Sequence, residues 1–400
     1  MKWEYTTIGD HCTVTSSKRF HLSDRSTTGV PFYCSKEIIQ KVNGEEISDC
    51  DFIKEESYEN VKKQYGVPES GDLLITTRGT YGIPYIYRDT DRFYFADGNL
   101  TWLKDFDGEL LVKYLYYWIL SYEGQKKIDA VAKGTAQKAV PIASIKMLQL
   151  PLPPVEVQER IAEVLFAYDT LIENNQKQIK LLEEAAQRLY KEWFIDLHFP
   201  GSEDTPIVDG VPEGWTLGEL GDIAIDSGKK EKKEHRGQYQ YYLPIDCLPK
   251  RSLAYTDKND ITLAESSLVA FMPNDILFGA MRPYFHKVVV ARDKGLTRTT
   301  CFVINSKTPA YWAYLLLLLF SKDTVDYATQ ISVGTTMPYV RWKDFTHMPT
   351  LIPPEEKCDA FQSIVLPIIE RISCLAVSCE RLIQARDRLL PKLMSGEIEV

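Results

Sequence analysis

The sequence predicts an α+β protein: two globular bodies of mixed α/β structure stand in tandem, joined by two long antiparallel helices that form a coiled coil. Two observations lead to this prediction. Much of the first half of the 400-residue chain recurs 200 residues later, and each copy ends in a heptad-patterned segment. The expected boundaries are 1–150 and 201–350 for the bodies, and 151–200 and 351–400 for the helices.

The repeat consists of matching residues in the same order. Gly134-Thr135, Pro153-Pro154 and Arg188-Leu189 recur as Gly334-Thr335, Pro353-Pro354 and Arg388-Leu389. Upstream the offset is 212, because Trp3 matches Trp215, so the two bodies differ in loop length. Inside the bodies, Asp72 to Ile75 followed by Arg78 resembles Asp275 to Phe278 followed by Arg282, and Tyr114 to Leu120 resembles Tyr311 to Leu317.

The tail after each double proline predicts one long helix. Its apolar residues keep a heptad register, and about 40 residues at ~1.5 Å each would run ~60 Å, longer than one compact domain usually covers. Two separate amphipathic helices, each on its own body, remain the alternative. Connectivity makes the pair antiparallel, and Asn175 is expected to fix its register. The predicted seam comprises Ile161, Leu165, Tyr168, Ile172, Asn175, Ile179, Leu182, Leu189, Phe361, Val365, Ile368, Ile372, Leu375, Leu382 and Leu389.

Composition is typical of a soluble intracellular protein with reduced thiols in a cytoplasm. The sequence shows no signal peptide or membrane span, the run Tyr311 to Phe320 is short enough for a buried helix, and eight cysteines lack a CxxC pair. The six histidines form no metal-ligand spacing, and no phosphate or dinucleotide motif is present. We therefore expect no catalytic residue, no metal site and no cofactor in this chain.

Polar, aromatic and basic residues on expected loops are of the kind that hold phosphates and read base edges. Each of them, taken singly, is more simply a solvated charge or a turn. The net charge of −9 falls mostly on the helical tails, which leaves the bodies nearly neutral. DNA binding by the chain alone should therefore be weak and salt-sensitive. The candidate contacts are Lys18, Arg19, Arg78, Thr80, Tyr81, Lys133, Thr135, Gln137, Lys138, Lys229, Lys230, Lys232, Lys233, Arg236, Arg282, Tyr284, Arg298, Thr335 and Thr336.

The order of these segments resembles the specificity subunit of type I restriction-modification systems. The stretches that carry the resemblance are Gly134 to Pro154 with Val157 to Ala162, Gly334 to Pro354 with its helix, Gly71 to Leu74 with Arg78 to Thr80, and Val211 to Trp215. Together they cover essentially the whole chain. The second copy departs from the family pattern at Met337-Pro338 and at Glu355 to Lys357.

The resemblance implies a non-catalytic, sequence-specific reader of double-stranded DNA. Each body would be a target recognition domain for one half of a split, asymmetric site, and the helices would set the gap. It further implies two modification subunits that bind S-adenosylmethionine and methylate adenine, with restriction subunits added for cleavage. Glu163, Glu173, Glu183 and Glu184 are candidate docking residues on the outer faces of the helices.

Two other functions remain open. A two-domain adaptor or scaffold with a coiled-coil spacer would bind proteins or glycans and have no nucleic-acid role, because one fold can host other functions. An enzyme with its own methyltransferase or nuclease activity would need a cofactor or metal site that the motifs do not propose.

Overall fold

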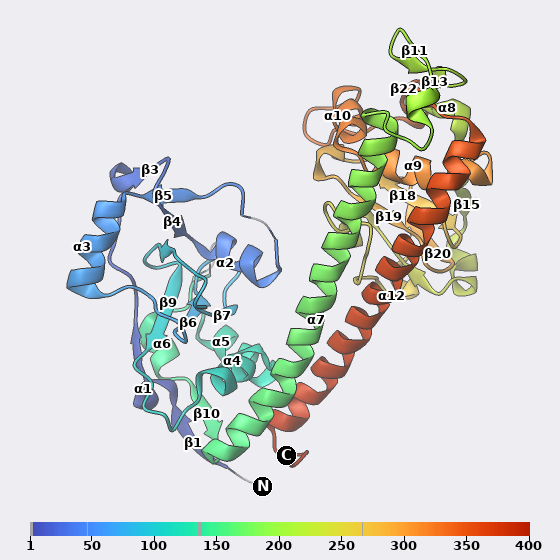
Figure 1. The fold of residues 1–400 in the computed structure, drawn as a ribbon. Coiled ribbons are helices and arrows are strands. Elements are labelled where there is room, and N and C mark those ends of the chain that lie inside the picture. Colours follow the sequence, from blue (N-terminus) through green and yellow to red (C-terminus); the bar gives the residue numbers. More distant parts are fainter. Residues whose placement is uncertain (1–2, 46, 135–137, 266) are drawn as a thin grey trace. The chain divides into compact units, whose positions relative to one another are not determined.

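The computed structural model describes residues 3–45, 47–134, 138–265 and 267–400 (Figure 1). The chain divides into two compact units. Unit 1 comprises Met1–Thr170 with Ile383–Val400, and unit 2 comprises Leu171–Leu382. Each unit holds one α+β body and a part of both long helices, α7 (Val155–Tyr190) and α12 (Glu355–Met394).

The body of unit 1 contains two four-stranded sheets and one two-stranded sheet. The sheet orders are β2-β9-β6-β7, β3-β5-β4-β8 and β1-β10. Helix α4 buries its aromatic face, including Tyr114 and Trp118, in the same core as Ile161 and Leu165 of α7. The elements are β1 (Glu4–Thr7), α1 (Ile8–His11), β2 (Thr13–Thr15), β3 (Arg25–Ser26), β4 (Val30–Tyr33), α2 (Ser35–Val42), β5 (Asp51–Ile53), α3 (Glu55–Tyr65), β6 (Leu73–Thr76), β7 (Pro84–Ile86), β8 (Tyr94–Phe95), β9 (Leu100–Lys104), α4 (Val112–Leu120), α5 (Tyr122–Val131), α6 (Ile142–Lys146) and β10 (Gln149–Leu152).

The body of unit 2 has the corresponding sheets β14-β21-β18-β19, β15-β17-β20-β16 and β13-β22, with the hairpin β11-β12 in addition. Helix α9 is buried along its whole length, as predicted for the run Tyr311 to Phe320. The elements are β11 (Ile207–Val208), β12 (Val211–Pro212), β13 (Thr216–Glu219), α8 (Leu220–Ile223), β14 (Ala224–Asp226), β15 (Lys229–Glu231), β16 (Tyr241–Tyr242), β17 (Leu268–Phe271), β18 (Ile276–Gly279), β19 (Val288–Val290), β20 (Gly295–Arg298), β21 (Cys301–Ser306), α9 (Trp312–Leu319), α10 (Lys322–Gln330), α11 (Trp342–Phe345) and β22 (Pro349–Ile352).

Strand pairing reproduces the offsets of the sequence repeat. In unit 1 Glu4 pairs with Leu152, and in unit 2 Thr216 pairs with Ile352, so one partner moves by 212 residues and the other by 200. Asp72 and Asp275 also share one role, because the carboxylate of each accepts the backbone N–H three residues before it. The internal repeat is therefore a repeat of structure.

One sequence alignment needs correction. The Tyr114 hydroxyl donates to the Pro151 carbonyl (2.9 Å), and the equivalent bond in unit 2 runs from Tyr314 to Leu351. Ser121 and Ser321 likewise cap α5 and α10. The offset here is 200, so the match of Tyr114 with Tyr311 was wrong. The run of leucines that follows Tyr314 allowed the helix to be aligned almost one turn out of place.

The second sheets of the two bodies differ in strand order. In unit 1, β4 lies between β5 and β8, whereas in unit 2 β20 lies between β17 and β16. Because β4 and β16 occupy the same place in chain order, an inner strand of unit 1 has become an edge strand in unit 2. The bodies therefore share one sheet closely and diverge in the other.

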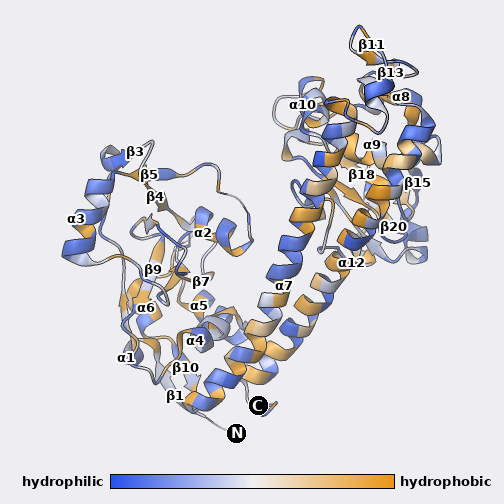
Figure 2. Ribbon diagram, in the orientation of Figure 1, coloured by the Kyte–Doolittle hydropathy of each residue, from blue (hydrophilic) through white to orange (hydrophobic). Residues whose placement is uncertain are grey.

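The long helices pack against each other within each unit and run antiparallel. In unit 2 the Asn175 amide donates to the Ser378 hydroxyl (3.1 Å), and the rings of Trp193 and Phe361 lie 5.4 Å apart. In unit 1 the Arg386 guanidinium binds the Asp169 carboxylate (2.7 Å). The predicted α+β fold with two paired long helices is confirmed, and Figure 2 shows apolar and polar residues alternating along both helices.

None of the predicted seam residues is exposed. Their polar member, Asn175, is half-buried and uses its side chain between the helices. The buried members are Ile161, Leu165, Ile172, Ile179, Phe361, Val365, Ile372 and Leu375, and the half-buried members are Tyr168, Asn175, Leu182, Leu189, Ile368, Leu382 and Leu389.

Helix α12 also has the length and composition of a membrane-crossing helix, although a third of its most apolar stretch is buried inside the protein. Phe361, Val365, Ile369 and Ile372 of this helix belong to the core of unit 2. We therefore interpret α12 as the core helix that its heptads predict.

Glu183 does not lie on an outer face of α7, contrary to the sequence interpretation. Its side chain is buried and accepts hydrogen bonds from the Ser252 hydroxyl and the Leu253 N–H, both at 2.7 Å. Heptad position alone could not reveal this contact, because the segment that covers Glu183 lies about 70 residues further along the chain. Glu163 and Glu184 are exposed, and Glu173 is half-buried.

Candidate nucleic-acid interface

A pair of loops in unit 1 brings several predicted contacts together. Strand β6 ends at Thr76, and the next residues pair with the segment before α6: the Val140 N–H donates to the Thr77 carbonyl (2.9 Å), and Arg78 forms a β-bridge with Ala139. Gly79 and Gly82 turn the chain at φ of 74° and 81°, values that favour glycine. The Arg78 turn thus lies beside Ala139, which itself forms a β-bridge with Lys133.

The side chains on this loop pair are mostly exposed. Arg78, Thr80, Lys133 and Lys138 all face solvent. Tyr81 is half-buried and its hydroxyl donates to Asp129, so this candidate holds the fold of the loop. The predicted contacts Thr135 and Gln137 lie outside the described residues.

Lys18 and Arg19 are exposed next to the same region. Arg19 pairs with Asp97 (2.9 Å), and Thr77 contacts the segment after Asp97, because its N–H donates to the Asn99 carbonyl (2.7 Å). The Lys18 ammonium lies 4.8 Å from the Tyr65 ring centre. The structure therefore links Lys18-Arg19 to the Arg78 turn through one short segment, although they are about 60 residues apart in sequence.

Unit 2 builds its loop pair on the same backbone contacts. The Val340 N–H donates to the Ala280 carbonyl (2.9 Å), and Met281 forms the β-bridge with Tyr339. Since Ala139 and Tyr339 match at the offset of 200, the structural counterpart of Arg78 is Met281. The pairing of Arg78 with Arg282 was therefore wrong by one residue. The offset of 203 that relates Asp72 to Asp275 continues unchanged to Arg78 and Met281, and the match had followed the arginine instead of the spacing.

Arg282 stabilises its loop pair through hydrogen bonds to backbone carbonyls of the neighbouring loop. Its backbone is left-handed at φ 51°, its N–H donates to the Pro338 carbonyl (2.7 Å), and its guanidinium reaches the Thr336 carbonyl (3.4 Å). The guanidinium Nε is buried without a partner in the described part of the chain. Tyr284, Thr335 and Thr336 are exposed on the same loops.

The remaining candidates lie on or beside the second sheet of unit 2. Lys229 and Lys230 are on β15, which pairs with β17, and Arg298 ends β20 on the other side of β17. All three are exposed, as is Lys232. Lys233 pairs with Glu265, and Arg236 donates to the Thr262 carbonyl (2.9 Å), so these two stabilise the sheet's connections.

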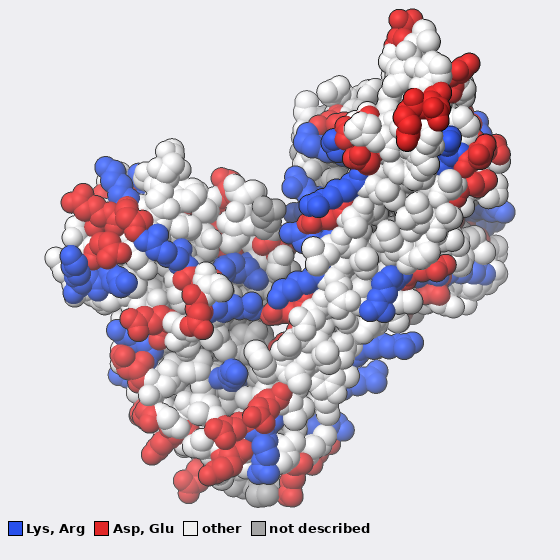
Figure 3. All heavy atoms as spheres, viewed as in Figure 1, with Lys and Arg blue, Asp and Glu red and all other residues white. Residues whose placement is uncertain are grey.

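Figure 3 shows that lysine and arginine are interspersed with aspartate and glutamate on the visible face of both bodies. Neither sign forms a continuous stripe there. This distribution agrees with the near neutrality of the bodies in sequence.

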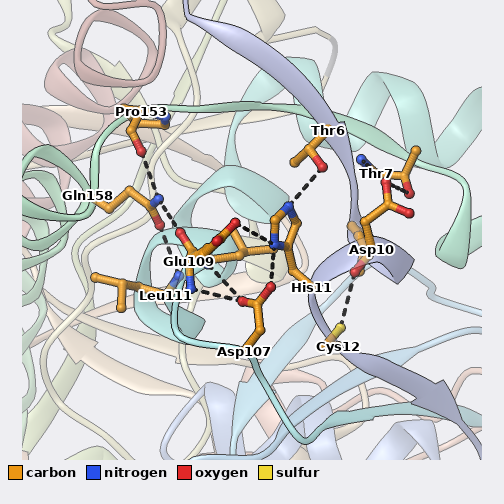
Figure 4. Close-up of polar contacts among 12 residues, drawn as sticks. Thr6, Thr7, Asp10, His11, Cys12, Asp107, Glu109, Leu111, Pro153 and Gln158 are labelled. Carbon is orange, nitrogen blue, oxygen red and sulfur yellow. Dashed lines mark hydrogen bonds and ion pairs between the residues drawn. The ribbon is translucent and has the colours of Figure 1, made fainter.

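One group of side chains was missed because its members are far apart in sequence. His11 Nδ1 lies 2.7 Å from Asp107 and 3.9 Å from Glu109, close enough for a metal site (Figure 4). However, the other ring nitrogen of His11 binds the Thr6 hydroxyl (2.8 Å), and Asp107 also accepts the Glu109 N–H (2.8 Å). Both ring nitrogens are used within the fold, so the group stabilises the 107–111 turn.

Comparisons with known proteins agree on one family. Residues 1–184 match the type I restriction modification DNA specificity domain. The chain is 28% identical over 355 residues to the type I restriction enzyme MjaIX specificity subunit of Methanocaldococcus jannaschii, covering 82% of this chain and 78% of that protein. It is 20% identical to the type I restriction enzyme HindI specificity subunit of Haemophilus influenzae, covering 82% and 87%. The crystal structure of a type I restriction-modification S subunit from Mycoplasma genitalium has the same fold, with a TM-score of 0.60, 16% identity, and coverage of 98% and 96%.

Proposed function

Because this chain belongs to the DNA specificity subunits of type I restriction-modification systems, we propose that its two bodies read two unlike halves of one split DNA target. The chain itself is the non-catalytic member of such a system. In this proposal body 1 and body 2 are target recognition domains, and each presents its paired loops to the base edges of one half-site.

This proposal rests on one observation: the loop pairs of the two bodies have the same backbone hydrogen bonds but carry different side chains. We call this shared backbone arrangement the frame. The bonds Val140 to Thr77 and Val340 to Ala280 hold the loop pair of each body in the same way. On that frame, unit 1 presents Arg78, whereas unit 2 presents Met281 at the matching position. Because base readout depends on the donors, acceptors and apolar groups presented, equal frames with different side chains should read different sequences.

The long helices are proposed to set the unread gap. Helix α7 has 36 residues and α12 has 40, which corresponds to about 54 and 60 Å at ~1.5 Å per residue. One turn of duplex measures ~34 to 36 Å. Half-sites separated by a helix of this length would lie on different turns of the DNA.

The chemistry of methylation would come from partners. Two modification subunits would dock on the long helices, bind S-adenosylmethionine and methylate an adenine that is flipped out of the duplex. Restriction subunits would complete the system for cleavage. The exposed Glu163 and Glu184 on α7 are candidate docking residues, and the assembly would work in the prokaryotic cytoplasm, where its DNA is.

The test is genome-wide mapping of adenine methylation in a host that expresses this chain with its cognate modification subunit. A single new split motif with two unlike halves and a fixed gap is expected, and it should disappear when the chain is omitted. The control is the same modification subunit with another specificity chain. If the control is active and this chain directs no methylation, the adaptor function becomes the better explanation.

A further inference from the structure

In unit 2 the tryptophan that opens the second repeat is covered by the protein's own chain. Trp215 is 7% exposed, and the Phe199 ring lies 4.9 Å from its ring. The next residue, Pro200, accepts a hydrogen bond from the Lys357 ammonium through its carbonyl (2.9 Å), and the same ammonium lies 5.5 Å from the Phe199 ring centre. An aromatic-proline segment thus packs on Trp215 beside the first turn of α12.

In unit 1 the corresponding place is an open hollow. Its volume is about 390 Å³, and it is lined by Trp3, which is the counterpart of Trp215, together with Leu152, Pro153, Pro154, Val155, Glu4 and Glu109. One edge of the Trp3 ring meets Gly396, where an added Cβ would come within 3.0 Å of the ring. Among the described residues no aromatic ring packs on Trp3, which is half-buried. The segment that follows α12 is the counterpart, at the offset of 200, of the segment that follows α7, and its Ile398 and Val400 pack against the same core as Trp3. This segment supplies no aromatic ring, so among the described residues Trp3 has no counterpart of Phe199.

The charge around the hollow is opposite to that around the covered site. The counterpart of Lys357 is Val157, so no lysine stands at the first turn of α7 in this position. Instead, Glu4 and Glu109 lie at the hollow, and the Glu109 side chain is 75% exposed. Among the described residues that line the hollow there is no lysine or arginine to match Lys357.

We propose that the hollow beside Trp3 is a docking site for an extended segment of a partner protein that presents an aromatic side chain followed by proline, next to a basic residue. The aromatic side chain and the proline are inferred from the Phe199-Pro200 segment, which covers Trp215 in unit 2 and serves as the internal template. The basic residue is inferred from Glu4 and Glu109, whose negative charges it would neutralise. The hollow is shallow and open to solvent, which suits an extended segment that lies across it. The inference does not depend on which DNA sequence the bodies read.

The experiment uses the full chain labelled with 5-fluorotryptophan and followed by fluorine NMR, with the Trp3 signal assigned through Trp3→Phe. The probe is a synthetic peptide with the sequence Leu-His-Phe-Pro-Gly preceded by two lysines. The Trp3 signal is expected to shift saturably while the other tryptophan signals stay in place. A peptide with alanine in place of phenylalanine should lose this effect.

Charge is tested with the double variant Glu4→Gln, Glu109→Gln, and Glu159→Gln, which is also exposed, is the matched control. Each exposed ion pair is worth ~0.2–1 kcal/mol, so the dissociation constant should rise by about 1.4- to fivefold per pair at low salt in the double variant only. A peptide without the lysines should bind both forms equally.

Phe199→Ala tests the internal template itself. Removing the aromatic cover should expose Trp215, and the same peptide should then shift the Trp215 signal as well. If the peptide does not shift the Trp215 signal in Phe199→Ala, the Phe199-Pro200 segment is not a valid template, and the choice of occupant is overturned. A Trp3 signal that ignores the peptide, or responds equally without phenylalanine, would also overturn the proposal. A Trp3 signal that moves with protein concentration alone would assign the hollow to a second copy of this chain.

Discussion

Glu183 shows how a single carboxylate joins a long helix to a body. It is 6% exposed, and its Oε1 atom accepts both the Ser252 hydroxyl and the Leu253 N–H within unit 2. Burial raises its pKa to about 7, while these hydrogen bonds oppose the rise. Between about pH 4.5 and pH 7, the folded protein therefore keeps a proton on the Glu183 carboxyl group. The unfolded chain, in which this pKa is near 4.5, would release that proton.

This difference predicts a pH-dependent stability. Because the pKa is higher in the folded state, the stabilising contribution is complete below about pH 4.5 and is lost as pH rises through about 7. The shift corresponds to about 3 kcal/mol. Glu183→Gln should therefore lose less stability than the parent between pH 5.5 and pH 8 in urea denaturation. Glu184→Gln, an exposed neighbour, should behave like the parent. Equal pH dependence in the parent and Glu183→Gln would contradict this assignment.

The loop residues differ in what their side chains are free to do. Arg78 is exposed, and no side-chain partner lies within the described residues. Arg282 contacts the Thr336 carbonyl and lies half-buried in its own loop. Arg78 is therefore the better candidate for a contact to a base, whereas Arg282 is the better candidate for holding a loop in place.

Arg78→Ala should relax recognition of one half-site and leave the other unchanged. The expected cost is about 1–3 kcal/mol at the affected base pair. Methylation mapping with the variant gives the readout, and Lys63→Ala, an exposed lysine on α3, is the control. A uniform loss over all sequences would instead mark Arg78 as a phosphate contact.

The long helices α7 and α12 make polar contacts, with each other and with the bodies, in addition to their apolar seam. In unit 1, Asp169 of α7 accepts both Arg386 of α12 (2.7 Å) and the Tyr117 hydroxyl of α4 (2.6 Å). In unit 2, Glu380 of α12 pairs with Lys258 (2.6 Å) and Arg292 (3.4 Å) of the body. These contacts give the helices a defined register as well as a buried face, as expected for polar groups on a coiled-coil seam.

Shortening both helices by one heptad should change the gap in the recognised site. Asn175 to Leu181 and Ile372 to Ser378 are suitable segments, because Asn175 lies opposite Ser378. Removing seven residues from each keeps the apolar face and shortens the pair by ~10.5 Å. The gap should shrink by up to about three base pairs while both half-sites keep their sequences. Deleting either segment alone breaks the pairing of the helices and serves as the control. An unchanged gap in the double deletion would contradict the proposal that the helices set the gap.

For the whole molecule, charge limits what the chain can do alone. The net charge is −9, and several candidate cations are already paired, including Arg19 with Asp97 and Lys233 with Glu265. These ion pairs compete with phosphate contacts, and the exposed candidate cations lie on bodies that are nearly neutral. We therefore expect the modification subunits to supply much of the phosphate neutralisation. The chain is expected to recognise DNA well only as part of a larger complex.

Fluorescence anisotropy with a duplex that contains the mapped site tests this expectation. The chain alone should bind weakly, and its affinity should fall further as salt is raised from 50 to 200 mM. Adding the modification subunit should raise the affinity and steepen the dependence of log K on log salt, since each additional phosphate contact adds to the slope. Tight, salt-independent binding by the chain alone would show that base contacts dominate.

The sequence by itself determined the repeat, the two long helices and the resemblance to type I specificity subunits. The offsets of 212 and 200 residues reappear as the strand pairs Glu4–Leu152 and Thr216–Ile352, because a duplicated pattern of local preferences folds into the same local structure twice. The heptads predicted both helices for the same reason, since helix periodicity is a local property. The division at residues 150, 200 and 350 stays a prediction, as do the individual DNA contacts.

Only the tertiary structure decided which polar residues are engaged within the fold and how the second sheets are ordered. Glu183, Arg282 and the group around His11 each find partners far away in sequence, up to 96 residues for His11 and Asp107. Strand order in β15-β17-β20-β16 likewise depends on pairing between strands that are far apart in sequence. Hydrogen bonding and burial between distant segments leave no periodic trace in the chain, so such contacts become visible only once it is folded.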